Sequence, residues 1–366
     1  MEREDLAAWL RLALAPGIGP ATARRLLAAF GLPRQVFEQE PQALGSVASA
    51  AQVQALRGEP PGFGAQLDTT WAWLQESASR RILTLAEPDY PPALLQTEDP
   101  PLMLYVSGAA LPAWPRAISV VGSRNPTPQG AINARAFSRT FAEAGFTVVS
   151  GLALGIDAAA HEGALEGAAG GALATIAVVG TGLDRVYPKQ NLALARRVAE
   201  QGLLVSEYPL GMGPLAENFP RRNRIIAALG EGTLVVEAAL QSGSLITARL
   251  AAEQGKDVFA IPGSIHSAQA RGCHALLRQG AKLVETAQDV LEELQAPTMP
   301  PRASASAEVP EPPLLQALGR DPVTLDALVA RTGTSAAELQ ARLLELELDG
   351  LVARLPGGLF QRVSSA

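Results

Sequence analysis

The chain has 366 residues, of which 48% are hydrophobic and 18% charged, and its formal net charge at pH 7 is −6. A chain of that length is longer than one domain with a single hydrophobic core usually is, so we expect two or three domains. Acidic residues outnumber basic ones by 36 to 30, so any site for a polyanion has to come from a local cluster of basic side chains.

The sequence also limits the compartment and the metal chemistry. No apolar run reaches the roughly 18 residues that a membrane span needs, and the start MEREDLAAWL does not resemble a signal peptide. We therefore expect a cytoplasmic protein with no membrane partner. Cys273 is the only cysteine, which excludes a disulfide framework and a zinc site built from cysteines. We expect no metal, no cofactor and a buried thiol.

Residues 1–80 are predicted to form a helical domain of the helix-hairpin-helix or SAM-like kind. Two apolar helical runs in LALAPGIGPATARRLLAAFG (12–31) are joined by the turn Pro16-Gly17-Ile18-Gly19. Such a turn exposes backbone N–H groups that can hold a phosphate, but its glycines suit a plain helix–helix connection equally well. Both interpretations stay open from the sequence.

Residues 81–295 alternate short apolar, β-branched runs with amphipathic helical stretches. The runs expected as strands are 117–123, 146–151, 174–180, 203–209, 232–238, 256–263 and 281–285, with 102–108 as one more. Continuous apolar strands followed by helices are typical of a parallel sheet covered on both faces. We therefore expect an α/β domain with an extended Rossmann-like, doubly wound parallel sheet of at least seven strands.

The C-terminal part predicts a linker and a small domain. Residues 296–312 are rich in Pro, Ala and Ser without hydrophobic periodicity, as linkers are. Residues 313–366 give three helical stretches and then a hairpin around Pro356-Gly357-Gly358. That order is typical of a winged-helix domain.

The loops that follow the predicted strands contain the candidate binding site. In a doubly wound sheet, ligands bind at the carboxyl ends of the strands. Small residues at helix N-termini leave N–H groups that favour an anion, and basic side chains add to this. The candidate DNA-binding residues are Gly122, Ser123, Arg124, Ser150, Gly151, Arg185, Lys189, Phe219, Arg221, Arg222, Arg224, Ser242, Gly243 and Ser244.

The distribution of charge supports this location. Residues 117–294 carry 15 basic and 16 acidic side chains, a net charge of −1, yet six of the basic ones fall in the strand-end loops. A nearly neutral domain can thus attract a polyanion at one rim. Phe219 stands just before Arg221-Arg222-Asn223-Arg224, where a ring can stack on any base, or else anchor the loop from below.

These loops also carry a family resemblance. The motifs VVGSR, SGLALGIDAAAH, TIAVVGTGLDRVYPKQN, SEYPLG, FPRRNRIIAAL and GCHALLRQGA closely resemble the DNA-processing protein A family, also called Smf. The resemblance implies a non-enzymatic protein that binds and protects incoming single-stranded DNA in natural transformation, or competence. It also implies that the protein loads the RecA recombinase onto this DNA for recombination.

The resemblance assigns roles to particular residues. DNA contacts are implied for Arg124, Lys189, Phe219, Arg221, Arg222 and Arg224. A homodimer is implied through the segment GCHALLRQGAKL, with His274, Leu277 and Leu283 on the dimer surface. RecA, and in addition a single-strand-binding protein, are the implied protein partners.

Two enzymatic alternatives remain. GEGTLVVEA (230–238) has a Gly-Thr motif followed by Glu237, as in lysine-decarboxylase-like phosphoribohydrolases that act on nucleotides. In those enzymes Pro-Gly-Gly precedes the motif, whereas this chain has Ala-Leu-Gly at that place. Glu237 is expected instead to bond a strand-end arginine or hydroxyl. Gly180-Thr181-Gly182 follows a strand as in nicotinamide dehydrogenases, but Arg185 stands where the third glycine is needed.

A hydrolase site is a further possibility, because Ser150, Asp157 and His161 lie within twelve residues. Ser150 is not in a G-x-S-x-G elbow, and no other group supplies a dedicated oxyanion hole. We expect Ser150 and Gly151 to face the DNA instead. Asp157 is expected to favour a helix N-terminus, with His161 packed against it or bonded to it.

The winged-helix unit is not expected to bind duplex DNA. Its third helix, 335–349, has four carboxylates against Arg342 alone, a net charge of −3 that repels phosphates. We expect this unit to bind protein or nothing. The fragment 308–366 should show no duplex affinity in a titration at low salt, and measurable binding there would contradict the hypothesis.

Overall fold

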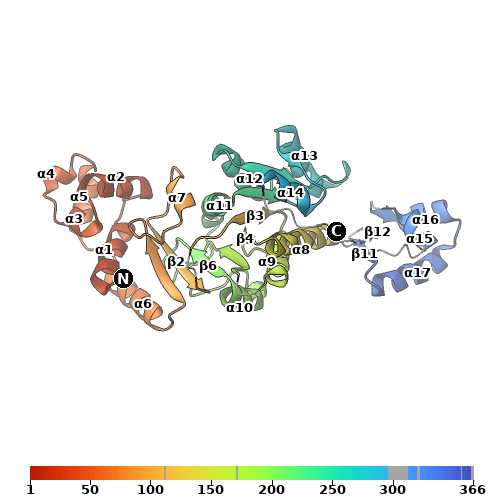
Figure 1. The fold of residues 1–366 in the computed structure, drawn as a ribbon, viewed down its shortest axis with the longest axis horizontal. Coiled ribbons are helices and arrows are strands. Elements are labelled where there is room, and N and C mark those ends of the chain that lie inside the picture. The colour runs from red at the N-terminus through yellow and green to blue at the C-terminus, as the bar shows by residue number, and fades with distance from the viewer. Residues whose placement is uncertain (111–112, 170–171, 296–311, 320–321, 356, 364–366) are drawn as a thin grey trace.

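The computed structural model describes residues 1–110, 113–169, 172–295, 312–319, 322–355 and 357–363 (Figure 1). The expected linker, 296–312, lies outside the described residues except for Pro312. Among the described residues, no helix is long and apolar enough to cross a membrane.

A cluster of helices precedes the sheet. It contains α1 (Arg3–Leu14), α2 (Pro20–Phe30), α3 (Pro33–Phe37), α4 (Pro41–Leu44), α5 (Ala50–Arg57) and α6 (Phe63–Gln75). Helices α2, α3 and α4 begin with proline, whose fixed φ and missing N–H suit a first helical turn. Buried Leu6, Leu26 and Trp73 form part of the core between these helices. Gly17, in the turn between α1 and α2, has a φ of 74°, a left-handed conformation that favours glycine.

The central sheet has nine strands, in the order β1-β2-β6-β5-β4-β3-β7-β8-β9. The strands are β1 (Arg80–Thr84), β2 (Met103–Gly108), β3 (Ala117–Val121), β4 (Thr147–Ser150), β5 (Thr175–Val178), β6 (Leu203–Ser206), β7 (Gly232–Val235), β8 (Asp257–Ala260) and β9 (Lys282–Leu283). Strands β3 to β9 are all parallel, which confirms the predicted doubly wound sheet. The additional strand at 102–108 exists as β2, but it is antiparallel to β6, and β1 pairs with it.

Helices cover both faces of this sheet (Figure 1). One face packs against α8 (Pro128–Glu143), α9 (Ile156–Gly167), α10 (Leu192–Gln201) and α14 (Ala287–Glu293). The other packs against α7 (Pro92–Leu95), α11 (Asn218–Leu229), α12 (Ser244–Glu253) and α13 (Arg271–Arg278). Short 3₁₀ turns, η1 (Lys189–Asn191) and η2 (Ala268–Ala270), lie in two of the connections.

Helices α8 and α9 approach closely because α9 presents glycines to α8. A Cβ atom on Gly163 would lie 2.0 Å from the carbonyl oxygen of Arg135, and one on Gly167 would lie 2.2 Å from that of Arg139. Residues four apart lie on the same side of a helix. The two glycines therefore form one groove that admits the backbone of α8.

The strand order creates a crevice in the middle of the sheet. From β3 the chain moves outward through β4, β5 and β6, and then returns to β7 on the other side of β3. Val121 of β3 lies opposite Val235 of β7, so the two strands end at the same level. Their following loops diverge from this point, which is where open α/β sheets bind ligands.

The C-terminal unit is a winged helix, as predicted. It contains α15 (Pro313–Leu318), β10 (Val323–Thr324), α16 (Leu325–Thr332), α17 (Ala336–Leu348), β11 (Val352–Leu355) and β12 (Leu359–Arg362), with the strand order β10-β12-β11. Leu328, Leu343 and Phe360 are buried between these elements. Pro356 of the expected hairpin turn lies outside the described residues, while Gly357 and Gly358 have positive φ angles.

Candidate nucleic-acid interface

A cleft of about 710 Å³ opens at the carboxyl ends of β3 and β7. We call it the rim cleft. Eight of the predicted site residues line it: Gly122, Ser123, Arg124, Phe219, Arg222, Ser242, Gly243 and Ser244. The loops after β3 and β7 and the beginnings of α11 and α12 supply them. The structure thus brings together residues that are up to 122 positions apart in the sequence.

An aromatic pair and an arginine form one side of the rim cleft. The ring centroids of Tyr187 and Phe219 are 5.5 Å apart, with 36° between the planes. The guanidinium carbon of Arg124 lies 5.5 Å from the Phe219 centroid. Phe219 is half-buried against Gly180, whereas the Tyr187 side chain is 45% exposed. Phe219 therefore anchors the beginning of α11 and also lines the cleft; its stacking on a base stays a prediction.

Tyr187 was missing from the predicted site. Its signal in the sequence was its position two residues before Lys189, in the run Tyr187-Pro188-Lys189. Thr247 also lines the cleft, as does Gln269, which was not predicted. Gln269 donates from Nε2 to the carbonyl of Asn125 at 2.9 Å. It comes from the segment after β8, which has no basic or glycine-rich motif to indicate a site.

Arg222 forms the floor of the rim cleft. It lies in the first half of α11, where the sequence predicted a loop, and it is only 4% exposed. Its Nη1 donates to the carbonyl oxygens of Gly151, at 2.6 Å, and Val178. Burial lowers the pKa of Arg222 to about 10, so the side chain remains charged at neutral pH. Arg222 therefore joins the ends of β4 and β5 to α11 and places a positive charge beneath the cleft.

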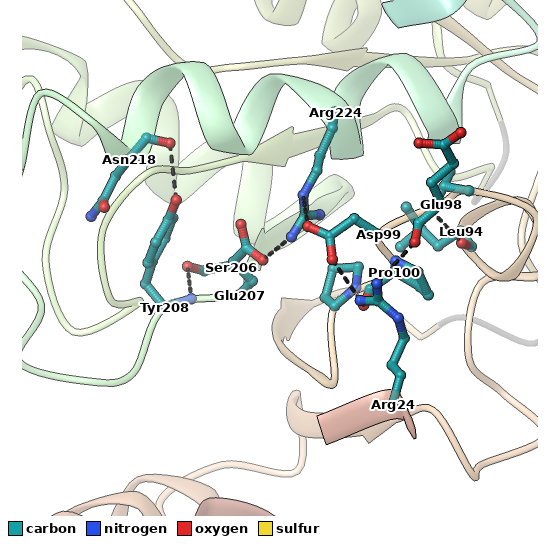
Figure 2. A network of polar contacts seen from close by, with 12 residues as sticks. Arg24, Leu94, Glu98, Asp99, Pro100, Ser206, Glu207, Tyr208, Asn218 and Arg224 are labelled. Atoms are coloured by element: carbon teal, nitrogen blue, oxygen red, sulfur yellow. Dashed lines mark hydrogen bonds and ion pairs between the residues drawn. The ribbon is translucent and has the colours of Figure 1, made fainter. Parts of the chain in front are cut away.

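Arg224 points away from the rim cleft, contrary to the prediction. Residues two apart on a helix point roughly 200° apart around its axis, so Arg222 and Arg224 face opposite sides of α11. Arg224 pairs with Glu207, and its Nε lies 3.3 Å from Oδ2 of Asp99 (Figure 2). Arg24 of α2 donates from Nη1 to Oδ1 of the same Asp99 at 2.5 Å.

These four residues, Arg24, Asp99, Arg224 and Glu207, form a chain of alternating charges, which we call the charge chain (Figure 2). It runs from the N-terminal helices to the carboxyl end of β6. Burial raises the pKa of Glu207, and the charge of Arg224 opposes that shift. Two carboxylates pair with the Arg224 guanidinium, through Nε and Nη2, so Arg224 serves the docking of α2 rather than an external phosphate.

Three other predicted cations are exposed but do not line the rim cleft. Arg185 pairs with the neighbouring Asp184 at 2.8 Å. The side chains of Lys189, in η1, and Arg221, in α11, make no hydrogen bond or ion pair within the described part of the chain. Both belong to segments that contribute an aromatic ring to the cleft, Tyr187 and Phe219 respectively.

Ser150 and Gly151 lie beneath the surface and do not face the cleft. Ser150 is fully buried, and its Oγ donates to the carbonyl of Val120 at 2.7 Å. A Cβ atom on Gly151 would lie 2.6 Å from the guanidinium of Arg222. These residues therefore shape the support for Arg222, and the prediction that they face DNA is wrong.

The trio Ser150, Asp157 and His161 does not form a hydrolase triad. His161 is fully buried, with Nε2 accepting from the N–H of Leu152 at 3.3 Å and Nδ1 lying 2.7 Å from Oγ1 of Thr175. The Thr175 hydroxyl donates to a carbonyl, so it accepts from Nδ1–H of His161. Asp157 accepts from the N–H of Ala153 at 3.3 Å instead. No hydrogen bond joins Asp157 to His161, which was one of the two arrangements expected for this pair.

Glu237 binds a hydroxyl, as predicted. Its carboxylate accepts from Oγ1 of Thr127 at 2.6 Å and from the Thr127 N–H at 2.9 Å. Thr127 is the N-cap of α8, so the carboxylate lies at that helix N-terminus. Burial raises the pKa of Glu237. Glu237, on which the phosphoribohydrolase alternative rested, thus binds the N-cap residue of α8.

The segment Gly180-Thr181-Gly182 lacks the helix that dinucleotide binding needs. The first helical residues after β5 are those of η1 (Lys189–Asn191), followed by α10. A pyrophosphate on the glycine turn would therefore not meet the N-terminus of a helix that follows the strand directly, as the dinucleotide-binding fold requires.

The predicted dimer residues lie at the β9 edge of the sheet. Leu283 of β9 is 54% exposed, while His274 and Leu277 of α13 are half-buried. The Nε2 atom of His274 lies 3.0 Å from the carbonyl oxygen of Gly263. A groove of about 570 Å³ between α12, α13 and the ends of β8 and β9 adjoins these residues.

The fold and the rim cleft define an extended Rossmann-like protein that joins a helical cluster to a winged-helix unit. Residues 81–295 match the DNA recombination-mediator protein A family, and residues 297–358 match the DprA winged helix domain. The chain belongs to the DNA recombination-mediator protein A family.

Relatives support this membership along most of the chain. Protein Smf of Escherichia coli is 43% identical over 303 residues, which cover 80% of each protein. The X-ray structure of DNA processing protein A from Streptococcus pneumoniae has a TM-score of 0.65 at 34% identity, over 82% of this chain and 99% of that one. A structure that describes the single-stranded DNA binding mode of DNA processing protein A from Helicobacter pylori has a TM-score of 0.53 at 32% identity, over 59% and 96%.

We expect His161 to make the protein less stable in mild acid. Burial lowers the pKa of His161 to about 3, below the value of about 6.5 in an unfolded chain. The stability gained from a neutral His161 is complete above pH 6.5 and falls as the pH is lowered toward 3. Between pH 6.5 and 5 the loss should be about 2 kcal/mol, measured by urea unfolding.

The substitution His161→Gln removes this titration and should reduce the pH dependence of the unfolding free energy. His266→Gln is the matched control, because His266 is exposed. Equal pH dependence in the wild-type protein and the His161 variant would contradict this account.

Proposed function

We propose that this protein binds single-stranded DNA along the rim cleft and acts in DNA processing during natural transformation. The observation that carries the proposal is the cluster of Tyr187, Phe219 and Arg124 at the crevice of the sheet. Aromatic rings stack on unpaired bases of any identity, at about 1–3 kcal/mol per base. Bases in a duplex are not available for such stacking, so the cluster favours a single strand.

Exposed cations near the rings complete the proposed interface. Arg124 lines the cleft, and Lys189 and Arg221 are exposed with no ion pair among the described residues. Each can pair with a phosphate without first breaking a salt bridge, and such contacts carry no sequence information. We therefore propose binding that does not depend on base sequence. The single-stranded DNA binding described for the Helicobacter pylori relative supports this function.

The cellular steps are proposed from the family. We propose that the protein protects the incoming strand, loads RecA onto it and works alongside a single-strand-binding protein. A binding role is favoured over a catalytic one because the candidate catalytic groups have structural partners. Glu237 holds the N-cap of α8, and Ser150 bonds the Val120 carbonyl.

We further propose that the chain forms a homodimer through α13 and the edge strand β9. Leu283 is exposed there, beside the adjoining groove. The winged-helix unit is proposed to bind protein. In α17, Arg342 pairs with Glu338 at 2.7 Å, while Glu345 and Glu347 are exposed and keep the surface acidic.

Removing cations from the interface should weaken DNA binding uniformly across sequences. For the double variant Arg124→Ala and Lys189→Ala, each lost phosphate contact should lower the slope of log K against log salt by about 0.7. The measurement is a titration of fluorescent oligonucleotides, single- and double-stranded, at several salt concentrations.

Arg139→Ala is the matched control for this experiment, because Arg139 is an exposed arginine on α8 outside the rim cleft. Its affinity and salt slope should equal those of the wild-type protein. Unchanged binding by the double variant would remove the rim cleft as the DNA site.

The dimer proposal is tested by placing a charge on the β9 edge. Leu283→Glu should produce a monomer in light scattering at concentrations where the wild-type protein is dimeric, because the carboxylate would be desolvated in the contact. Leu348→Glu is the control, since Leu348 is 81% exposed on the winged-helix unit. A dimeric Leu283 variant would place the contact elsewhere.

A further inference from the structure

Three of the helices that begin around the rim cleft, α8, α9 and α12, differ in the groups at their N-termini. Glu237 places a carboxylate at the beginning of α8, and Asp157 lies in the first turn of α9. Helix α12 has Gly243 as its N-cap and no acidic residue in its first turn. A helix N-terminus favours a negative charge. The chain itself places a carboxylate at the other two N-termini, so α12 is the one of these three helices that lacks an acidic group there.

Two buried polar groups of the rim cleft also lack partners. Arg222 is 4% exposed, and its Nε has no hydrogen-bond acceptor among the described residues. Thr247, in the first turn of α12, is 1% exposed, and its Oγ1 is likewise unpaired. Unpaired buried polar groups are rare because they cost free energy. Both residues line the cleft, so an anion held there would compensate a buried positive charge.

The groups at the beginning of α12 are suited to a phosphate. The Oγ atoms of Ser242 and Ser244 lie 2.7 Å apart, and the Ser244 N–H lies 3.4 Å from Oγ of Ser242. One of the two hydroxyls donates to the other, so the second is free to donate to a phosphate next to the helix dipole. The N–H groups of Ser244, Leu245 and Ile246 already donate to Ser242 and Gly243. The cleft that also contains Phe219 and Tyr187 has a volume of about 710 Å³, within the range of small-molecule sites.

We propose that the rim cleft is a site for a nucleotide phosphomonoester, with its phosphate at the beginning of α12 above Arg222 and its base against Phe219 and Tyr187. A phosphomonoester at pH 7.5 carries more negative charge than the phosphodiester inside a strand. The ligand is therefore either the phosphorylated end of a DNA strand or a free nucleotide. The strand-end form rests on the proposed function; the free-nucleotide form does not.

The first experiment compares ligands that differ only in the terminal phosphate. Oligothymidylates with a 5′-phosphate, a 3′-phosphate or two hydroxyl ends are titrated against the full chain at pH 7.5, alongside dTMP and thymidine by calorimetry. We expect one phosphorylated end to bind about tenfold more tightly than the hydroxyl ends, from the added charge near a partly buried cation. We also expect dTMP to bind and thymidine not to bind.

The second experiment fills the site with a carboxylate of the protein itself. Gly243→Asp is sterically free, because a Cβ atom there meets no atom within 4 Å and the φ angle is −62°. It should raise the melting temperature by about 1–2 °C, as an acidic N-cap does, and abolish the preference for a terminal phosphate. Arg249→Gln is the matched control, since it changes the charge of the same helix equally and Arg249 does not line the rim cleft.

The outcomes separate this inference from the proposed function. Equal affinity for all three oligonucleotides, with no binding of dTMP, overturns the phosphomonoester site but leaves single-strand binding intact. Binding of dTMP without binding of any oligonucleotide supports the site and overturns the proposed function. A Gly243→Asp variant that keeps the preference overturns the assignment to α12.

Discussion

Arg222 is the residue on which the arrangement of the rim cleft depends. Moving a guanidinium out of water costs several kcal/mol unless other groups solvate it. Here the carbonyls of Gly151 and Val178 do so, at the ends of two neighbouring strands. Because β4 and β5 are adjacent, the Arg222 side chain can bond to the ends of both. It thereby fixes the distance between these strand ends and α11. The same helix carries Phe219, so the position of the aromatic ring follows from that of a buried charge.

This constraint gives physical reasons for two residues near Arg222. Gly151 has to lack a side chain because the guanidinium occupies that space. Asp157 lies close enough for its charge to counter the lowering of the Arg222 pKa that burial causes. The groups beneath the cleft therefore form a polar layer at the carboxyl ends of the strands. Tyr187 lies against Phe219, which belongs to the same helix as Arg222.

Regular features of the fold were predictable from the sequence, whereas the directions of individual side chains were not. Apolar runs indicated each parallel strand, because buried parallel strands are apolar on both faces. The run Arg221-Arg222-Asn223-Arg224 looked like one basic loop, but it is helical, and its arginines point in different directions. Strand β1 begins with two arginines and was not distinguished from the preceding helices.

Long-range partners were also beyond local patterns. Asp99, which engages Arg224, lies in a loop with no motif, and Gln269 reaches Asn125 from 144 residues away. Ser150 follows two valines at a strand end, where one residue of register decides whether a hydroxyl is buried or exposed. The family resemblance placed Arg224 among the residues of the site, although Arg224 is engaged by the contact with the N-terminal helices and does not line the rim cleft.

The charge chain has a practical consequence for work with fragments. The match to the family begins at residue 81, which makes that residue an obvious place to begin a shorter protein. Such a fragment would keep Asp99, Arg224 and Glu207 but lose Arg24, and two carboxylates would then face a single guanidinium. The uncompensated negative charge would lie beside α11, the helix that also carries Phe219 and Arg221. Such a fragment therefore has a different electrostatic environment at the proposed interface from that of the whole chain.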